Sequence, residues 1–231
     1  MTSSGTYNYN ISAAEAVLAA LERCQIRAPS IRTEHMNTAK NEFNLLMAEW
    51  ANKQVNLWKV ELDTVALVQG TATYTLTPQT VMVLDAYVSL NYGTTSQSDT
   101  YITPMSRTQY ASIGNKSTQG RPTSYWFDRT ITPTLTMWPV PDASGPYQMS
   151  WYAAIQIQDV SLPSGTTLDL PYRWLDAAVA GLAYRMARVY APQLVPMLKQ
   201  DAMEAWQTAA TQDVENANFS IAPSLSSFYR R

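Results

Sequence analysis

Residues 41–68 read NEFNLLMAEWANKQVNLWKVELDTVALV, and the spacing of the apolar residues changes within this stretch. Up to Trp50 they recur every three or four residues, which predicts one face of an α-helix. After Asn56 apolar and polar residues alternate, which predicts a β-strand with one buried face. The chain therefore passes from a helical segment to a β segment at about residue 56.

Two helices are predicted before this change of period. Ser12, followed three residues later by Glu15, has the spacing of a capping box at the start of the first helix. Pro29-Ser30 ends this helix. Two helices joined by a short break predict a helical hairpin. The apolar stripes expected on them are Ala14, Val17, Leu18, Leu21 and Cys24 on the first, and Met36, Ala39, Phe43, Leu46, Met47 and Trp50 on the second.

The middle of the chain predicts six or seven strands, most of them linked by short turns. Their β-branched and aromatic residues form short runs that glycine, proline and polar residues separate. A short helix near 105–113 interrupts the series. Such a series predicts an antiparallel sheet or a small sandwich. The runs that carry the pattern are 57–68, 70–76, 81–90, 123–129, 133–138 and 147–157.

The helical period returns near residue 170. A third helix begins at Asp169 or Pro171 and ends at Pro192, and a fourth runs from about 193 to 213. The two terminal helix pairs can then pack together, with the β segment between them in the chain. The expected apolar positions are Trp174, Leu175, Ala178, Val179, Leu182, Ala183 and Met186 on the third helix, and Leu194, Leu198, Ala202, Ala205 and Trp206 on the fourth.

The predicted fold class is α+β: a helical bundle from the N- and C-terminal helix pairs, an inserted antiparallel β domain and an extended C-terminal arm. The arm has five large apolar residues, which a purely solvated tail would not need. We expect it to order against a partner; the alternative is a disordered end with incidental aromatics. The predicted segments are an N-terminal arm (1–10), a helical domain (11–55 and 168–213), the β domain (56–167) and the C-terminal arm (214–231) with Phe219, Ile221, Leu225, Phe228 and Tyr229.

The chain is poor in charge. Asp, Glu, Lys and Arg make up 15 % of it, where about 25 % is ordinary. It carries 14 Tyr, 7 Trp and 10 Met, which are residue types that protein interfaces favour. These numbers predict a surface largely covered by neighbouring proteins, although a β-rich domain that prefers Thr and Tyr in its strands is an alternative.

The charge balance and the single cysteine limit the other partners. A net charge of −2 supplies no basic field for nucleic acid. No apolar run approaches the roughly 20 residues of a membrane-spanning helix, so no membrane partner is expected. Cys24 cannot pair within the chain and residues 1–10 have no cationic, apolar leader, which predicts synthesis in a reducing cytoplasm.

The familiar catalytic patterns are missing from the sequence. Lys116-Ser117 fails as a phosphate-binding loop, because Gln109 stands where the first glycine is needed. One histidine, His35, and one cysteine, Cys24, have no metal-ligand spacing, so neither a metal nor another cofactor is predicted. His35 is expected at the start of a helix, on the surface or as a cap, and Cys24 as a buried, inert thiol.

A pair of carboxylates is harder to exclude, because glycosidases need only two. A peptidoglycan-degrading enzyme is therefore the alternative function, and a carbohydrate-binding β domain is a third. Helix faces and turns are simpler interpretations of the carboxylates, and core packing of the aromatics. The carboxylate candidates are Glu15, Glu22, Asp85, Asp128 and Asp142, and the candidate sugar platforms are Trp126, Trp138 and Trp151.

Residues 114–128, GNKSTQGRPTSYWFD, resemble a binding loop but predict a helix-to-strand junction. Gly114 is expected to cap the preceding short helix, and Pro122 forces the residue before it into an extended conformation. Alternation in the following strand places Tyr125 and Phe127 on one face and Trp126 on the other.

With catalytic signals absent, the order of several segments becomes informative. It resembles the head-to-tail adaptor proteins of tailed bacteriophages, specifically the tail accessory factor family of short-tailed phages. The resemblance covers about residues 10–212. The segments that carry it, in order, are NEFNLLMAEWANKQVNLWKVE (41–61), TATYTL (71–76), ITPMSRTQYASIGNKSTQGRPTSYWFD (102–128), LTMWPVPD (135–142) and LDLPYRWLDAAVAGLAYRMA (168–187).

This resemblance implies a structural virion protein rather than an enzyme. Such adaptors assemble in the host cytoplasm as a ring, typically of twelve copies, at the head-tail junction. The ring closes the DNA exit of the portal protein and presents a platform to the tail tube or nozzle protein, and packaged DNA passes through it without sequence-specific binding. The helical part docks on the portal and the terminal arm reaches along neighbouring subunits. Lys116 and Arg121, in the junction at 114–128, are candidates for contact with an adjacent subunit.

Overall fold

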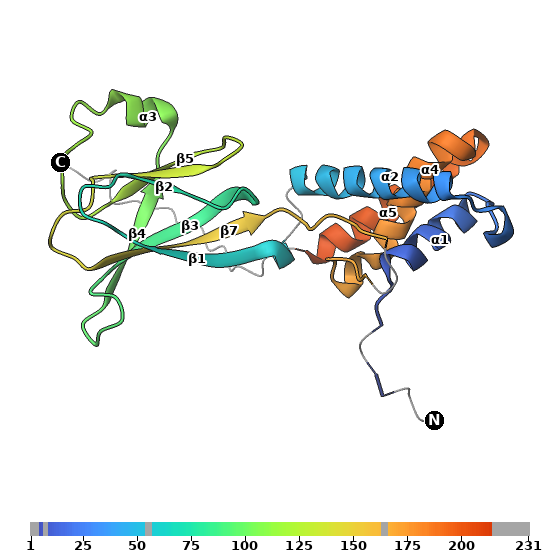
Figure 1. The fold of residues 1–231 in the computed structure, drawn as a ribbon, viewed down its shortest axis with the longest axis horizontal. Coiled ribbons are helices and arrows are strands. Elements are labelled where there is room, and N and C mark those ends of the chain that lie inside the picture. The colour runs from blue at the N-terminus through green and yellow to red at the C-terminus, as the bar shows by residue number, and fades with distance from the viewer. Residues whose placement is uncertain (1–4, 7–8, 54–56, 163–165, 214–231) are drawn as a thin grey trace, which may run out of the picture.

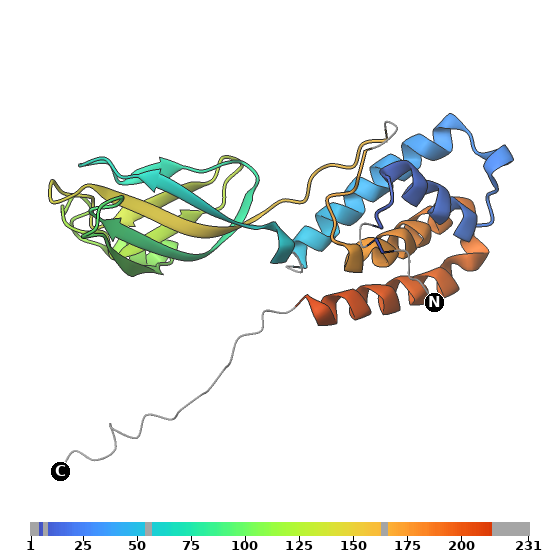
Figure 2. The same ribbon diagram turned by 90° about the horizontal axis from the view of Figure 1, so that it is seen from below.

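The protein is elongated, with helices at one end and a curled β-sheet at the other. A computed structural model describes residues 5–6, 9–53, 57–162 and 166–213 (Figure 1). Figure 2, turned by 90°, shows the same separation of helices from strands. We call α1, α2, α4 and α5 the helical body, and the seven strands with α3 the β body. The predicted α+β class is confirmed.

The elements follow one another in the order helices, strands, helices. Short 3₁₀ turns at Leu57–Lys59 and Tyr172–Trp174 lie where the chain enters the β body and where it re-enters the helices. The helices are α1 (Ala13–Arg23), α2 (Thr33–Asn52), α3 (Arg107–Ser112), α4 (Leu175–Tyr190) and α5 (Val195–Gln212), and the strands are β1 (Val60–Ala66), β2 (Thr73–Thr75), β3 (Thr80–Leu90), β4 (Ser98–Pro104), β5 (Ser124–Asp128), β6 (Thr134–Trp138) and β7 (Tyr147–Ile155).

Local hydrogen bonds fix where the first two helices begin. The Ser12 hydroxyl accepts from the Glu15 amide at 3.2 Å, and the Glu15 carboxylate accepts from the Ser12 amide at 2.8 Å. The predicted capping box is therefore confirmed. At the start of α2, the Nδ1 atom of His35 accepts from the Arg32 amide at 3.0 Å, which confirms a capping position for the histidine.

Helix α4 is the centre of the helical body, packing against α1, α2 and α5. Its predicted stripe is confirmed, since Trp174, Ala178, Leu182 and Met186 have no exposed surface. On α5 the burial is narrower than predicted, with Leu198 and Ala209 as its buried residues. None of the described helices is long and apolar enough to span a bilayer.

The buried face of α1 differs from the predicted stripe. Leu18 is 39 % exposed and Ala14 is only partly buried. The segment that precedes α4 covers the start of the helix, and the amide of Ala13 donates to the carbonyl of Thr166 at 2.9 Å. The buried face of α1 packs against α4, and three of its five buried residues are alanines. The buried residues of α1 are Ala13, Ala16, Val17, Ala20 and Leu21.

The seven strands form one curled sheet in the order β1-β7-β3-β4-β5-β6-β2. The sequence pattern missed β4, because six of its seven residues are exposed and only Ile102 is buried. The prediction of a purely antiparallel sheet is wrong at one place. Strands β4 and β5 are parallel, and α3 lies in the crossover between them.

Two separate hydrophobic clusters stabilise the two bodies. One lies inside the curled sheet around Tyr125, Met137 and Met149, and the other lies among the helices. Ile157 and Val160, which the sequence grouped with the β domain, pack in the helical cluster. Trp58, in the segment that enters the sheet, packs against the same cluster, so both segments that cross between the bodies contact the helical core.

Candidate interaction surfaces

Lys116 is engaged within its own chain. Its Nζ atom donates to the carbonyls of Ala111 and Ile113, at 3.3 and 3.0 Å, and lies 5.6 Å from the centre of the Tyr110 ring. These bonds satisfy carbonyls at the C-terminal end of α3. The cap residue of this helix is Ile113, in an extended conformation, so the prediction of Gly114 as the cap is wrong.

An aromatic pair joins α3 to the sheet. Tyr110 stacks on Trp126 with ring centres 5.2 Å apart. The guanidinium carbon of Arg107 lies over the Trp126 ring, 5.8 Å from its centre, and Arg107 donates to the carboxylate of Asp128 at 3.1 Å. Because Tyr125 points into the sheet core and is 1 % exposed, the predicted alternation of this strand is confirmed.

Arg121 ties the loop before β5 to the neighbouring strands. Its Nη2 atom donates to the carbonyls of Val88 and Ser98, at 3.3 and 3.0 Å. Its Nε atom is buried and has no hydrogen-bond partner among the described residues. The structure thus gives Arg121 a role inside the β body, and its role between subunits stays a prediction.

Replacing Arg121 with glutamate is expected to lower the free energy of unfolding by about 1–3 kcal/mol, because two carbonyls lose a donor and face a negative charge. Denaturant unfolding followed by circular dichroism would measure the loss. The matched control is Arg129→Glu, since Arg129 is exposed and has no ion pair within the described residues. Equal stability of the two variants would contradict the assignment.

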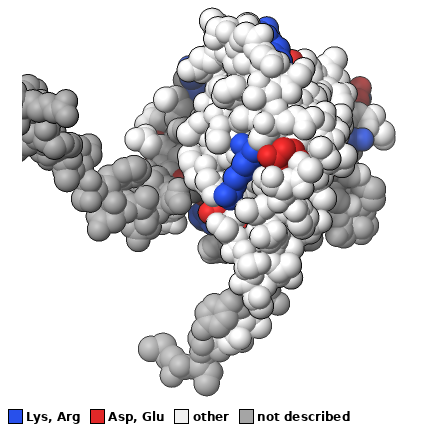
Figure 3. All heavy atoms as spheres, turned by 90° about the vertical axis from the view of Figure 1, so that its left-hand side faces the viewer, with Lys and Arg blue, Asp and Glu red and all other residues white. Residues whose placement is uncertain are grey.

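Four loops, 67–72, 91–97, 114–121 and 139–146, form the end of the β body remote from the helices. We call them the tip. Backbone hydrogen bonds connect them, for example from Gly70 to Pro141 and from Gly120 to Val140. Figure 3 shows that few charged side chains reach the surface here.

The charges of the tip are held by internal bonds. Its charged residues are Lys116, Arg121 and Asp142, and the first two bind backbone carbonyls. The carboxylate of Asp142 accepts from the Ser144 amide at 2.9 Å and from the Tyr147 hydroxyl at 3.0 Å. These bonds, that of the Ser144 amide foremost, hold the pKa of Asp142 below its ordinary value. The surface of the tip therefore consists mainly of uncharged groups.

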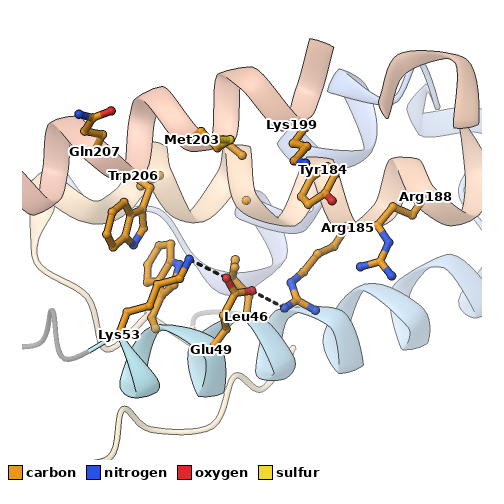
Figure 4. Close-up of a pocket in the computed structure, with 14 residues that line it drawn as sticks. Leu46, Glu49, Lys53, Tyr184, Arg185, Arg188, Lys199, Met203, Trp206 and Gln207 are labelled. Atoms are coloured by element: carbon orange, nitrogen blue, oxygen red, sulfur yellow. Dashed lines mark hydrogen bonds and ion pairs between the residues drawn. The ribbon is translucent and has the colours of Figure 1, made fainter. Parts of the chain in front are cut away.

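A second surface is a groove in the helical body, which we call the α4 groove. Helices α2 and α5 form its walls and α4 its base (Figure 4), and its volume is about 540 Å³. Small residues shape the base. At Gly181, a Cβ atom would lie 2.9 Å from a methyl carbon of Leu46. The lining consists of Leu46, Glu49, Trp50, Lys53, Ala177, Gly181, Tyr184, Arg185, Arg188, Lys199, Ala202, Met203, Trp206 and Gln207.

One carboxylate and four cations line this groove. The carboxylate of Glu49 accepts from Lys53 at 2.6 Å and from Arg185 at 2.7 Å, as Figure 4 shows. Burial raises the pKa of Glu49, but the two hydrogen bonds and positive charges outweigh it, so the pKa lies below its usual value. Arg188 and Lys199 form no ion pair within the part of the chain that the structure describes. Sequence reasoning missed this groove, because its lining residues come from three helices that are not all adjacent in the chain.

Three of the five carboxylate candidates have structural roles. Glu15 caps α1, Asp128 pairs with Arg107 and Asp142 closes a turn. Glu22 and Asp85 are exposed, the latter at a bulge of β3.

The aromatic and metal candidates belong to the framework. Trp151 is buried in the sheet core, whereas Trp138 donates to the Asn115 carbonyl at 3.3 Å. Burial raises the pKa of Cys24 to about 11, and its thiol donates to the Ala183 carbonyl. Among the described residues, no cluster of three or more His, Cys, Asp or Glu could hold a metal ion. The five predicted arm residues, Phe219, Ile221, Leu225, Phe228 and Tyr229, lie outside the described residues.

A family model described as SU10 adaptor protein matches residues 13–223. The chain belongs to the SU10 adaptor protein family. This adaptor is a bacteriophage structural protein, which confirms the head-to-tail adaptor family suggested by the order of its segments. The family implies a component of the virion that associates with portal and tail proteins. A search of curated proteins found no match to the adaptor.

Proposed function

We propose that the adaptor forms a closed ring of twelve copies beneath the portal of a short-tailed phage. The ring closes the DNA exit after packaging and provides the platform to which the tail tube or nozzle attaches. The helical body docks on the portal, and the β body faces the tail. The adaptor assembles in the host cytoplasm and remains at the head-tail junction of the virion.

The observation that carries this proposal is the difference between the two ends of an elongated chain. The helical body has a groove in which Arg188 and Lys199 form no ion pair with any described residue, whereas the charged residues of the tip are all held by internal bonds. Two chemically different ends suit a protein that joins two different partners. Lateral contacts between identical copies form a closed ring when the rotation that relates neighbours closes.

The low charge of the chain is consistent with such an assembly. A net charge of −2 gives little attraction for packaged DNA, so DNA passes through the ring without sequence-specific binding. The exposed apolar residues Leu62 and Tyr152 lie side by side on β1 and β7. They are candidates for contact with a neighbouring copy, together with Lys116 and Arg121.

The C-terminal arm, 214–231, is proposed to bind the portal or a neighbouring copy through its five large apolar residues. Asp213, the residue before it, is buried and pairs with Arg173, which fixes the point from which the arm departs. Apolar residues at an interface contribute most when they fill pockets on the partner.

A chain ending at residue 213 is expected to remain folded, because both hydrophobic clusters lie before this point, and to lose attachment to the purified portal of the same phage. Native mass spectrometry of the mixture would give both the attachment and the number of copies. The control is the full chain, which should form a complex with twelve copies. Undiminished attachment of the shortened chain would contradict the role of the arm, and a full chain that never binds the portal would contradict the proposed function.

A further inference from the structure

The α4 groove has the shape of a binding site for a helix. Helices α2 and α5 both pack on α4 and have little contact with each other, so a space remains above α4 between them. Helices that pack together have axes about 8–10 Å apart. The absence of a side chain at Gly181 lets Leu46 pack closely on α4. Leu46 and Trp50 are both buried and close the base of the groove.

The exposed apolar surface of the groove lies on α5. Met203 is 62 % exposed, and the ring of Trp206 lies 4.9 Å from the Nζ atom of Lys53. Figure 4 shows Trp206 and Gln207 at one end of the groove and Arg188 at the other. Methionine is a flexible, polarisable side chain that adapts to different apolar partners. This part of the surface would be covered best by apolar side chains at helical spacing.

The charges of the groove select the sign of its partner. Lys53 and Arg185 are neutralised by Glu49, and Arg185 also contacts Glu42 at 3.1 Å. Arg188 on α4 and Lys199 on α5 therefore remain as cations without a partner among the described residues. A groove with this excess of positive charge, on a chain of net charge −2, favours a negatively charged ligand.

We propose that the α4 groove receives an acidic amphipathic helix of the protein on which the helical body docks. The apolar side chains of that helix pack on Met203 and Trp206 of α5, and its carboxylates pair with Arg188 and Lys199. This mode is the insertion of an amphipathic helix into an apolar groove between helices. The source of this helix, the docking partner, rests on the proposed function. The preference of the groove for an acidic amphipathic helix does not depend on that function.

A protein helix fits the groove better than nucleic acid does. Binding to a phosphate backbone needs many cations that release counterions, and only two cations of this groove, Arg188 and Lys199, have no ion pair with a described residue. Its apolar wall and base would have no contact with phosphates. The arm of a second copy, residues 214–231, fits less well, because its charged residues are one acid and two bases. These residues are Glu215, Arg230 and Arg231.

The test is a binding measurement with the full-length adaptor and labelled probes. The first probe is a helical peptide of about 18 residues, five turns, with leucines on one face and glutamates beside them. The second has lysines in place of the glutamates, the third is a duplex DNA of similar length, and the fourth is a peptide of residues 214–231. We expect the acidic peptide to bind and the other three to bind at least about tenfold more weakly.

Two variants locate the binding in the groove. Arg188→Glu with Lys199→Glu should weaken the acidic peptide at least about tenfold, and Met203→Ser should weaken it several-fold. The matched control is Arg27→Glu with Lys40→Glu, which reverses two exposed cations of the helical body outside the groove. Failure of the acidic peptide to bind, equal binding of any other probe, or equal effects of the groove and control variants would overturn the proposal.

Attachment to the purified portal separates this inference from the proposed function. If the wild-type adaptor and the Arg188→Glu, Lys199→Glu variant attach equally well, the groove is not the docking site and the inference fails while the proposed function stands. If the wild-type adaptor does not attach, the proposed function fails. The peptide measurements then still decide whether the groove binds acidic helices.

Discussion

Replacing Trp174 with alanine is expected to lower the free energy of unfolding by about 3–5 kcal/mol, the usual cost of removing a fully buried large aromatic side chain. Trp174 has no exposed surface. Its ring centre lies 5.0 Å from that of Trp50, 5.3 Å from that of Trp58 and 6.5 Å from that of Trp206. One side chain thus joins α2, the junction and α5 at the start of α4.

Urea unfolding followed by circular dichroism would measure this loss. The control is Trp174→Phe, which keeps an aromatic ring in the cluster and should lose less than half as much. A loss below about 1 kcal/mol for the alanine variant, within the range of ordinary surface substitutions, would show that the cluster does not stabilise the helical body as described.

Replacing Asp169 with alanine is expected to lower the free energy of unfolding by about 2–4 kcal/mol, because a nearly buried cation loses its main partner. The Asp169 carboxylate lies 3.1 Å from the Nζ atom of Lys59, whose side chain is 11 % exposed. It also accepts from the Gln158 amide at 3.0 Å, and its backbone carbonyl accepts from the indole of Trp58 at 3.2 Å. Asp169 therefore binds both segments that cross between the two bodies.

Two measurements distinguish this role from a general loss of stability. Unfolding curves give the free energy, and small-angle X-ray scattering gives the overall dimensions, which should change in the folded variant as the two bodies reorient. Asp176→Ala is the control, since Asp176 is 74 % exposed in its pair with Arg23 and such pairs contribute at most about 1 kcal/mol. Unchanged scattering and a loss no greater than that of the control would contradict the junction.

Residue patterns predicted the elements whose burial follows a regular period. The stripe of α4 from Trp174 to Met186 and the capping box at Ser12 are where the spacing placed them. The exposed strand β4 has one buried residue, Ile102, so its sequence has no alternation of apolar and polar residues from which a strand could be predicted. The parallel pairing of β4 with β5 depends on the crossover through α3, which leaves no periodic signal in either strand.

The surfaces were less predictable than the fold, because they depend on residues far apart in the chain. Arg121 looked like an exposed contact, yet it donates to carbonyls of β3 and the start of β4. The α4 groove brings Lys53 together with Trp206, more than 150 residues later in the chain. Only the packing of three helices reveals that Arg188 and Lys199 flank one hollow.

The pairing of β1 with β7 bears on the order in which the protein folds. The helical body draws its helices from both sides of the β body. Assembling it first would require closing a loop of about 120 residues, from the end of α2 at Asn52 to the start of α4 at Leu175, at an entropic cost that rises with length. Val60 and Ala154 are paired across β1 and β7, which brings the two crossing segments together once the sheet forms. We therefore expect the helical cluster to complete last. Pulsed hydrogen exchange should show protection in β7 before protection in α4, and the reverse order would refute it.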